Sequence, residues 1–208
     1  RRGAVIHRIL ARSGLPATIV LPARAFRGVA ARAIEDADGN VTVMSNGAIG
    51  VTGTPVGGIG IDTAITQPAS AGRIAVTANA IFATGVGVNV VNGGTGTSAV
   101  TTTGTVTTGG DGVNVLSNGA FSIATGGALT SGANAIQTNG LNGGVITVNA
   151  GGVVRGLGTS VASAVVDVTT PVGQTTTINN NGAIRSTNAT VLGAAGDLAI
   201  RGAGGNVI

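Results

Sequence analysis

The chain has 208 residues, 38 of them glycine, and it contains no Cys, Trp, Tyr or Lys. Its low charge and its supply of Ile, Val and Leu exclude an intrinsically disordered chain, which combines low hydrophobicity with high net charge. The absence of Cys excludes disulfide frameworks, thiolate metal sites and cysteine nucleophiles. Collagen is excluded because Gly does not recur at every third residue.

The formal net charge of +4 is distributed unevenly along the chain. Residues 1–34 hold seven Arg and no acid, whereas residues 35–208 hold four Arg and seven acids, which gives 4 − 7 = −3. The basic segment has no aromatic residue other than Phe26 and no nucleic-acid-binding motif. We therefore expect no nucleic-acid partner.

Residues 1–33 form a basic leader in this interpretation, and residues 34–208 form the second unit. Arg-rich stretches flank a short apolar run at residues 15–21, and the leader ends in a small-x-small pattern at residues 31–33. These features resemble a secretory signal, but Arg24 and Arg27 lie between the apolar run and the expected cleavage site. A poorly ordered N-terminal segment is the alternative, and both interpretations stay open.

From residue 41 onward, apolar residues recur in pairs separated by one residue, which is typical of short, half-buried β-strands. Most members are β-branched, which favours strands. The pairs are Val41/Val43, Ile59/Ile61, Ile74/Val76, Val88/Val90, Val113/Val115, Phe121/Ile123, Ile146/Val148 and Val166/Val168.

Asn-Gly dipeptides lie between these pairs and predict tight corners, because Asn and Gly tolerate a positive φ. They begin at Asn46, Asn92, Asn118, Asn139, Asn142 and Asn181. If the corners of successive repeats stack, their Asn side chains are expected to form amide ladders.

The stretch from Ile74 to Gly110 carries no charge and is long enough to span a membrane as a helix. Thr, Asn and Gly interrupt it throughout, and its apolar residues alternate with a period of two. This pattern predicts strands rather than a membrane helix.

A unit of Gly, a small residue and an aliphatic residue recurs along the body, at spacings of 32, 25, 23, 25 and 30 residues. Its aliphatic members are Ile49, Ile81, Val106, Leu129, Val154 and Ile184. In four units a second apolar residue follows seven positions later, at Val88, Val113, Ile136 and Val191. Self-similarity of this kind predicts a solenoid, in which stacked units share one core.

The sequence therefore predicts an all-β fold, a right-handed parallel β-helix (β-solenoid) of about six irregular coils of 23–32 residues. Each coil would contain three short strands, with Ile, Val, Leu and Ala inside and Thr, Ser and Asn outside. The narrow interior accounts for the presence of only three Phe.

Residues 40–208 resemble the β-helical passenger region of bacterial autotransporters and related large surface adhesins. The resemblance is carried by residues 181–184 (Asn-Gly-Ala-Ile) followed by Ala199-Ile200, and by residues 46–49 (Asn-Gly-Ala-Ile) followed by Gly60-Ile61. It implies a segment of a larger exported chain with a C-terminal outer-membrane barrel. It implies no catalytic residue.

Catalysis requires polar groups that converge, and the sequence offers few of them. His7 is the only His, so neither a Ser-His-acid triad nor a zinc site is expected. The acids are Glu35, Asp36, Asp38, Asp62, Asp111, Asp167 and Asp197. Those after Asp38 are far apart in sequence, although stacking could bring two of them together as a carboxylate pair.

Two segments resemble calcium sites, and neither is complete. Residues 109–112 (Gly-Gly-Asp-Gly) match a single copy of the β-roll nonapeptide, which binds calcium only in tandem copies. Residues 35–40 are rich in oxygen ligands but lack the spaced Glu of a helical calcium loop. We therefore expect no metal site and no cofactor.

The predicted function is that of a structural or adhesive stalk segment of a bacterial surface protein, without catalysis, at the outer membrane or secreted. Its partner would be a host or matrix glycan or protein bound at the solenoid face, with no membrane span in this chain. The Thr run at residues 101–108 is interpreted as an outward strand face or as an ice- or polysaccharide-binding array.

Two other functions stay open. One is a glycan-active β-helix enzyme, a lyase or hydrolase, whose carboxylates converge only in three dimensions. The other is a self-associating, amyloid-like matrix protein, because low-charge segments with a period of two favour edge pairing.

Overall fold

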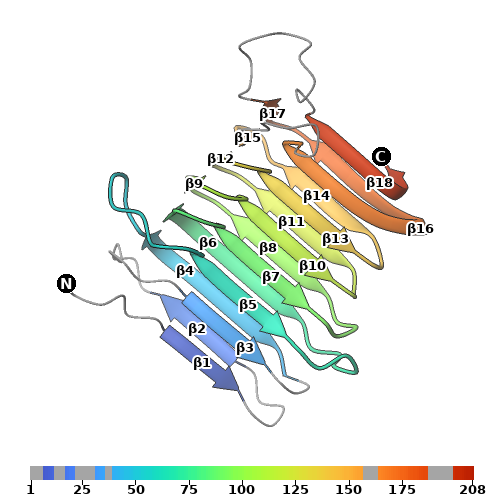
Figure 1. Cartoon of the computed structure of the whole chain (residues 1–208), viewed down its shortest axis with the longest axis horizontal. Coiled ribbons are helices and arrows are strands. Elements are labelled where there is room, and N and C mark those ends of the chain that lie inside the picture. The colour runs from blue at the N-terminus through green and yellow to red at the C-terminus, as the bar shows by residue number, and fades with distance from the viewer. Residues whose placement is uncertain (1–6, 12–16, 22–30, 36–38, 157–163, 187–198) are drawn as a thin grey trace.

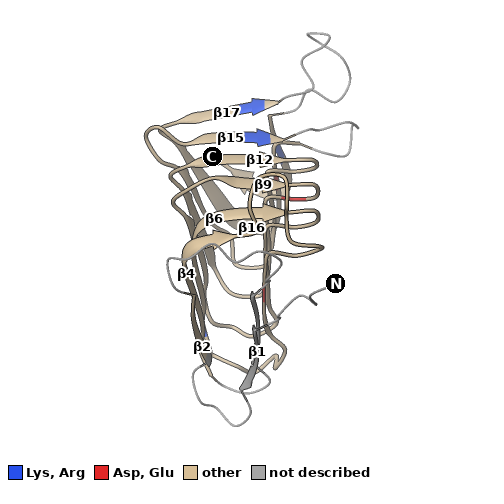
Figure 2. Ribbon diagram, turned by 90° about the vertical axis from the view of Figure 1, so that its left-hand side faces the viewer, with Lys and Arg blue, Asp and Glu red and all other residues tan. Residues whose placement is uncertain are grey.

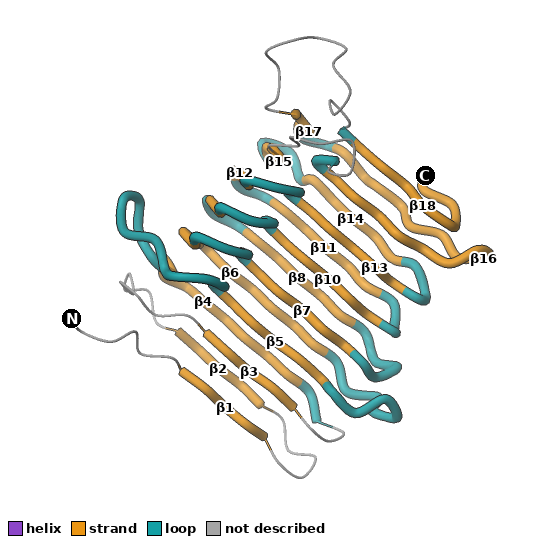
Figure 3. The backbone as a smooth tube through the Cα atoms, viewed as in Figure 1, coloured by secondary structure: helices purple, strands orange, loops and turns teal. Residues whose placement is uncertain are grey.

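The computed structural model describes residues 7–11, 17–21, 31–35, 39–156, 164–186 and 199–208, and within these ranges the chain is all-β, without a helix. The strands form one curled sheet in which every pairing between strands is parallel. Figure 1 shows the strands stacked in chain order, and Figure 3 shows the loops gathered at the two ends of the strands.

The strands have the following bounds in chain order: β1 (His7–Ala11), β2 (Ala17–Leu21), β3 (Ala31–Glu35), β4 (Val41–Ile49), β5 (Ile61–Ile65), β6 (Ile74–Ala83), β7 (Val88–Asn92), β8 (Ser98–Thr102), β9 (Val106–Thr108), β10 (Val113–Ser117), β11 (Phe121–Thr125), β12 (Ala128–Ser131), β13 (Ile136–Gly140), β14 (Gly144–Val148), β15 (Val153–Gly156), β16 (Val166–Asn180), β17 (Ala183–Ser186) and β18 (Ile200–Val207).

The pairings sort these strands into three columns, which is the arrangement of a β-solenoid-like fold. In the middle of the chain, each strand pairs with the third strand after it: β7 with β10 and β10 with β13, β8 with β11 and β11 with β14, and β9 with β12 and β12 with β15. The long strands bend and serve two columns each, as β6 does by pairing with both β8 and β9. We call one step along a column a rung.

The strand register confirms the repeat that the sequence predicts. The recurring aliphatic residues are register partners in a single column, which runs Ile49, Ile81, Val106, Leu129, Val154, Ile184. In the neighbouring column, Val88 pairs with Val113 and Val113 with Ile136. Val191, the other predicted member of that series, lies outside the described residues. The irregular spacings therefore arise from loops of different length between aligned strands.

The uncharged stretch from Ile74 to Gly110 holds strands β6 to β9, as predicted. Among the described residues, the structure contains no helix with the length and hydropathy needed to cross a membrane. One predicted strand pair is displaced, because Ile59 precedes the strand that begins at Ile61.

The basic segment at the start of the chain contributes strands to the same sheet. β1 pairs with β3, β2 with β4, and β3 with β5, all in parallel register. The predicted boundary between residues 33 and 34 falls inside β3. Whether the segment also acts as a secretory signal stays a prediction.

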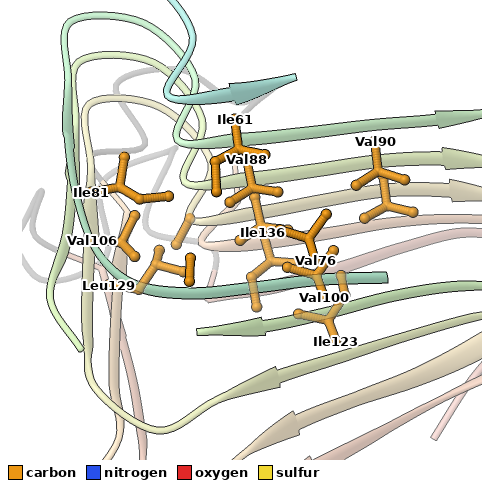
Figure 4. Close-up of a cluster of buried hydrophobic side chains, with 14 of the residues drawn as sticks. Ile61, Val76, Ile81, Val88, Val90, Val100, Val106, Ile123, Leu129 and Ile136 are labelled. Atoms are coloured by element: carbon orange, nitrogen blue, oxygen red, sulfur yellow. The ribbon is translucent and has the colours of Figure 1, made fainter. Parts of the chain in front are cut away.

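The core lies inside the curled sheet and is built from files of aliphatic side chains, one per column. Figure 4 shows three such files, and in each of them side chains of similar size stack on one another. The first contains Ile81, Val106 and Leu129, and the third contains Val76, Val100 and Ile123. The second contains Ile61 and Val88, followed by Val113 and then Ile136. Burial of these side chains stabilises the stack, at about 25 cal/mol per Å² of apolar surface.

Phe121 is the one aromatic side chain of the described core, and its neighbours are small to make room for it. It is 3% exposed. A Cβ added at Gly140 or Gly144 would lie 2.6 Å from its ring. On the other side, the hydroxyls of Ser98 and Ser117 bond to each other at 3.0 Å. The prediction that aromatic residues fit poorly in this interior holds for the described core. Phe121 is accommodated because Gly140 and Gly144 leave space for its ring.

The corners are formed as predicted at four of the Asn-Gly dipeptides, but the reason for glycine is different. Of the glycines in these dipeptides, Gly143 alone has a positive φ, +65°. At Gly119 an added Cβ would lie 2.0 Å from the carbonyl oxygen of Gly96, and at Gly96 it would lie 2.0 Å from that of Gly72. Glycine is required here because backbones stack directly on one another, with no space for a side chain.

The remaining two dipeptides lie within strands. Asn46-Gly47 lies inside β4, where the register with β6 shifts between Ser45 and Ala48. Asn139-Gly140 ends β13. At Asn46 the corner is a bend within the strand, where β4 passes from the column of β8 to the column of β9 without leaving the sheet.

Candidate functional site

A column of polar side chains runs across the middle of the sheet. Its members are register partners, namely Asp62, Asn89, Asn114, Gln137, Asp167 and Arg201. Asn89, Asn114 and Asp167 each lie between two buried valines of their strands, as Asn89 does between Val88 and Val90. The column therefore places three of the residue types that the sequence analysis considered, Asp, Asn and Arg, in one line.

An amide ladder is present in this column, but its Asn residues lie within strands and not at the corners where the sequence predicts it. Asn89 Nδ2 donates to Asp62 Oδ1 and Asn114 Nδ2 donates to Asn89 Oδ1, both at 2.9 Å. The prediction that corner Asn residues pair with one another is wrong for Asn118 and Asn142. Each donates instead to a backbone carbonyl one rung away, Asn118 to Gly93 at 2.6 Å and Asn142 to Asn118 at 2.8 Å.

At the other end of the column, Asp167 forms an ion pair with Arg201. Arg201 Nε donates to Asp167 Oδ1 at 2.8 Å, and Nη2 donates to Oδ2. Hydrogen bonding to this carboxylate raises the pKa of Arg201 above its ordinary value. The pair ties β18 to β16.

The structure keeps the acids of the column apart. Asp62 and Asp167 are separated by four rungs, roughly 19 Å at the spacing of paired strands. A glycosidase pair requires about 5–9.5 Å. Asp111 lies in the loop before β10, where its Oδ1 accepts a hydrogen bond from the backbone N–H of Asn134 at 3.1 Å.

Within the part of the chain that the structure describes, the remaining acids give no further site. Asp36, Asp38 and Asp197 lie outside the described residues, and Glu35 ends β3. The part of the chain that the structure describes contains no group of three or more His, Cys, Asp or Glu that could hold a metal ion. In the Gly-Gly-Asp-Gly segment, the carbonyls of Asp111 and Gly112 accept hydrogen bonds from the N–H groups of Gly87 and Val88. The segment is thus an ordinary corner of the stack.

Burial raises the pKa of Asp111 above its usual 3.8, the hydrogen bond from Asn134 lowers it, and the charge of Asp167 raises it further. A raised folded-state pKa means that the folded chain binds a proton at a pH where the unfolded chain has released it. The contribution of Asp111 to stability is therefore present at low pH and is lost as the pH rises through the folded-state pKa.

We expect the substitution Asp111→Asn to remove this pH dependence, because the amide oxygen still accepts the hydrogen bond from Asn134 and does not titrate. The free energy of unfolding of the unmodified chain should increase from neutral pH down to about pH 4, relative to that of the variant. Urea titrations of both proteins across this range measure the difference. If the free energy of unfolding changes equally with pH in both proteins, Asp111 is not the group responsible.

An open groove lies at the outer edge of the stack. The connection between β4 and β5 leaves the stack there, closes on itself through an antiparallel bridge between Val51 and Thr54, and returns at Val56, which pairs with Ala83 (Figures 1 and 3). The groove between this connection and the outer face of β6 and β9 has a volume of about 690 Å³. It is lined by Val51, Thr52, Gly53, Pro55, Phe82, Ala83, Thr84, Thr105, Thr107, Thr108 and Gly109.

From this groove a column of outward side chains continues over β12, β15 and β17. Its register partners are Phe82, Thr107, Thr130, Arg155 and Arg185. Both Arg side chains are exposed, and Figure 2 shows them on adjacent strands of the stack. We call this column, with the groove, the arginine face.

The Thr run does not form an array. It turns a corner between β8 and β9, so Thr102 and Thr108 point inward while Thr105 and Thr107 are exposed in the groove. Thr107 pairs with Phe82 on one side and with Thr130 on the other, and the next residue of the column is Arg155. Thr therefore does not recur on successive rungs beyond Thr130. The interpretation as an outward strand face holds for the exposed members only.

The arginine face was not predicted from the sequence, although the repeat contains the necessary signal. Each member directly follows an aliphatic residue of the repeating unit, as Phe82 follows Ile81 and Arg155 follows Val154. Aligning the repeats on the aliphatic residue and reading one position further would have placed the two Arg side by side. The groove gave no such signal, because it depends on how the β4–β5 connection folds back.

Residues 1–47 match a protein-family model described as a family of unknown function, DUF6101. The match covers the first strands of the stack and leaves the rest of the chain unassigned. No curated protein and no solved structure matches the chain significantly.

Proposed function

We propose that the chain is a structural and adhesive stalk segment of an exported bacterial surface protein. The observation that carries the proposal is the continuous set of parallel strand columns, which joins strands from β1 to β18 in one stack. In such a stack each rung contacts only its neighbours, so length is gained by adding rungs without rearranging a core. This property suits a stalk.

In this proposal the stack is a right-handed β-helix of about six irregular coils. Parallel strands joined by crossover connections are right-handed in nearly all proteins. The polar side chains that face outward, mainly Thr, Ser and Asn, suit many weak hydrogen bonds to glycans or matrix proteins. The resemblance to autotransporter passenger regions, based on residues 181–184 and 46–49, supports a location at the bacterial surface.

The positions of the acids support a role without catalysis. Asp62 accepts a hydrogen bond from Asn89, the last Asn of the ladder, and Asp167 accepts one from Arg201. Asp111 binds a backbone N–H. Each of these three carboxylates thus has a structural partner, and Asp62 and Asp167 are too far apart to act as a pair on one glycosidic bond.

Deletion of one repeat tests the architecture. Removing residues 88–112 joins Gly87 to Val113, the register partner of Val88. Strands β10, β11 and β12 should then pair with the strands that β7, β8 and β9 had paired with, and the shortened chain should unfold cooperatively with an unchanged strand signal in circular dichroism. Removal of residues 88–99 shifts the register and serves as the control that should fail to fold. Equal loss of folding in both deletions would contradict the solenoid.

Antibody labelling tests the location. Antibodies raised against the 208-residue chain should label intact cells of the source bacterium without permeabilisation. Labelling that appears only after permeabilisation would place the protein inside the cell and would overturn the proposed function.

A further inference from the structure

Two like charges stand next to each other on the arginine face. Arg155 and Arg185 are register partners on β15 and β17, so their Cα atoms are one rung apart, about 4.8 Å. Like charges directly opposite each other in a sheet destabilise it. The ion pair between Arg201 and Asp167 involves neither of these two side chains.

The net charge of the chain after residue 34 is −3, so a pair of exposed Arg is unusual in this body. Two guanidinium groups one rung apart can bind one anionic group between them or two anionic groups along a chain, and charge-assisted hydrogen bonds of this kind are short and strong. Their repulsion is relieved when an anion binds. The Arg pair therefore indicates an acidic ligand.

The other end of the arginine face has a different chemistry. Phe82 is half-buried in the groove, beside the exposed hydroxyls of Thr105 and Thr107. An aromatic ring packs against the C–H face of a sugar, while Thr hydroxyls donate and accept hydrogen bonds. Three rungs, about 14 Å, separate Phe82 from Arg155 along the column.

The spacing along the face suits a polymer. One rung is close to the length of one sugar ring in an extended polysaccharide, so successive sugars would meet successive members of the column. Thr130 occupies the rung between Thr107 and Arg155 and keeps the face flat. An extended chain can therefore lie along the stack from the groove to the Arg pair.

We propose that the arginine face binds a linear acidic polysaccharide, with a sugar ring on Phe82 in the groove and carboxylate or sulfate groups on Arg155 and Arg185. The inference rests on the proposed function, because it specifies the ligand of an adhesive stalk. An added peptide strand fits less well, since β12 and β15 are already paired on both sides. Nucleic acid fits less well because it requires a larger basic surface.

Affinity measurements on the full 208-residue chain test the proposal. The probes are polygalacturonate, dextran sulfate and unsubstituted dextran, each titrated calorimetrically at low and at physiological salt. The chain should bind at least one of the two acidic polymers, and unsubstituted dextran at least tenfold more weakly. Arg155→Gln and Arg185→Gln should each weaken binding about tenfold, the loss of a charge-assisted contact. Phe82→Ala should weaken binding at both salt concentrations.

Arg73→Gln is the matched control, because it removes the same charge from an exposed residue at the opposite end of β6 from Phe82. It should change the affinity less than twofold. Equal weakening by Arg73→Gln and Arg155→Gln would show binding by net charge alone and would overturn the proposal. Failure to bind either acidic polymer would also overturn it, and so would equal binding of unsubstituted dextran. If the repeat deletion still folds in these cases, the stalk function stands while its ligand is not an acidic polysaccharide.

Discussion

Replacement of Phe121 by Ala is expected to lower the free energy of unfolding by about 3–5 kcal/mol, the usual cost of removing a buried aromatic side chain. The ring is 3% exposed and fills a part of the core where the facing residues of the next rung are glycines. Since those glycines have no side chains to move inward, the cavity cannot collapse. We therefore expect the cost to fall in the upper part of this range.

Gly140 allows the cause to be isolated. An added Cβ there would lie 2.6 Å from Cδ1 and Cε1 of Phe121. The nearest atom of any other residue is the carbonyl oxygen of Gly143, at 3.6 Å. Gly140→Ala should therefore destabilise the chain when Phe121 is present and cost little when it is Ala. The double variant should be more stable than the sum of the two single effects predicts.

Gly144→Ala is the control for this cycle. Its added Cβ would meet the Phe121 ring at 2.6 Å and also the backbone oxygen of Phe121 at 2.6 Å, which Phe121→Ala leaves in place. Phe121→Ala should thus remove most of the destabilisation caused by Gly140→Ala and little of that caused by Gly144→Ala. Urea unfolding followed by far-ultraviolet circular dichroism measures all variants, since the chain has no Trp or Tyr. Strictly additive effects at Gly140 would contradict the proposed contact.

The repeat made the strand register predictable from the sequence. Val106 and Leu129 occupy the same place in successive units, and the structure pairs them directly. This works because a parallel stack aligns equivalent residues at every level, so sequence spacing translates into neighbours in space. The fold class followed from the same periodicity.

Features that depend on one particular connection were not predictable in this way. The groove exists because the segment after β4 folds back through the Val51–Thr54 bridge, and no repeat in the sequence records it. The glycine at residue 119 was predicted for its tolerance of positive φ, yet it is required by close backbone stacking. Such requirements become visible only when the distance between levels is known.

The ion pair at the end of the polar column joins β16 to β18. The Asp167 side chain is 5% exposed and the Arg201 side chain 35% exposed. When Arg201 is lost, a buried carboxylate remains without its partner, which is costly. When Asp167 becomes neutral, the guanidinium remains near water and can be solvated. The two halves of one ion pair should therefore contribute unequally to stability.

We expect Arg201→Gln to lower the free energy of unfolding of this end of the stack by about 3 kcal/mol, and Asp167→Asn by about 1 kcal/mol. Because rungs contact only their neighbours, the loss should be local, and β18 should open while the levels around β10 stay closed. Hydrogen exchange of the backbone amides of β18 and β10 measures both effects in one experiment. If both variants accelerate hydrogen exchange in β18 equally, the two halves of the ion pair contribute equally and the prediction is wrong. If exchange in β10 accelerates as much as in β18, the stack unfolds as one unit.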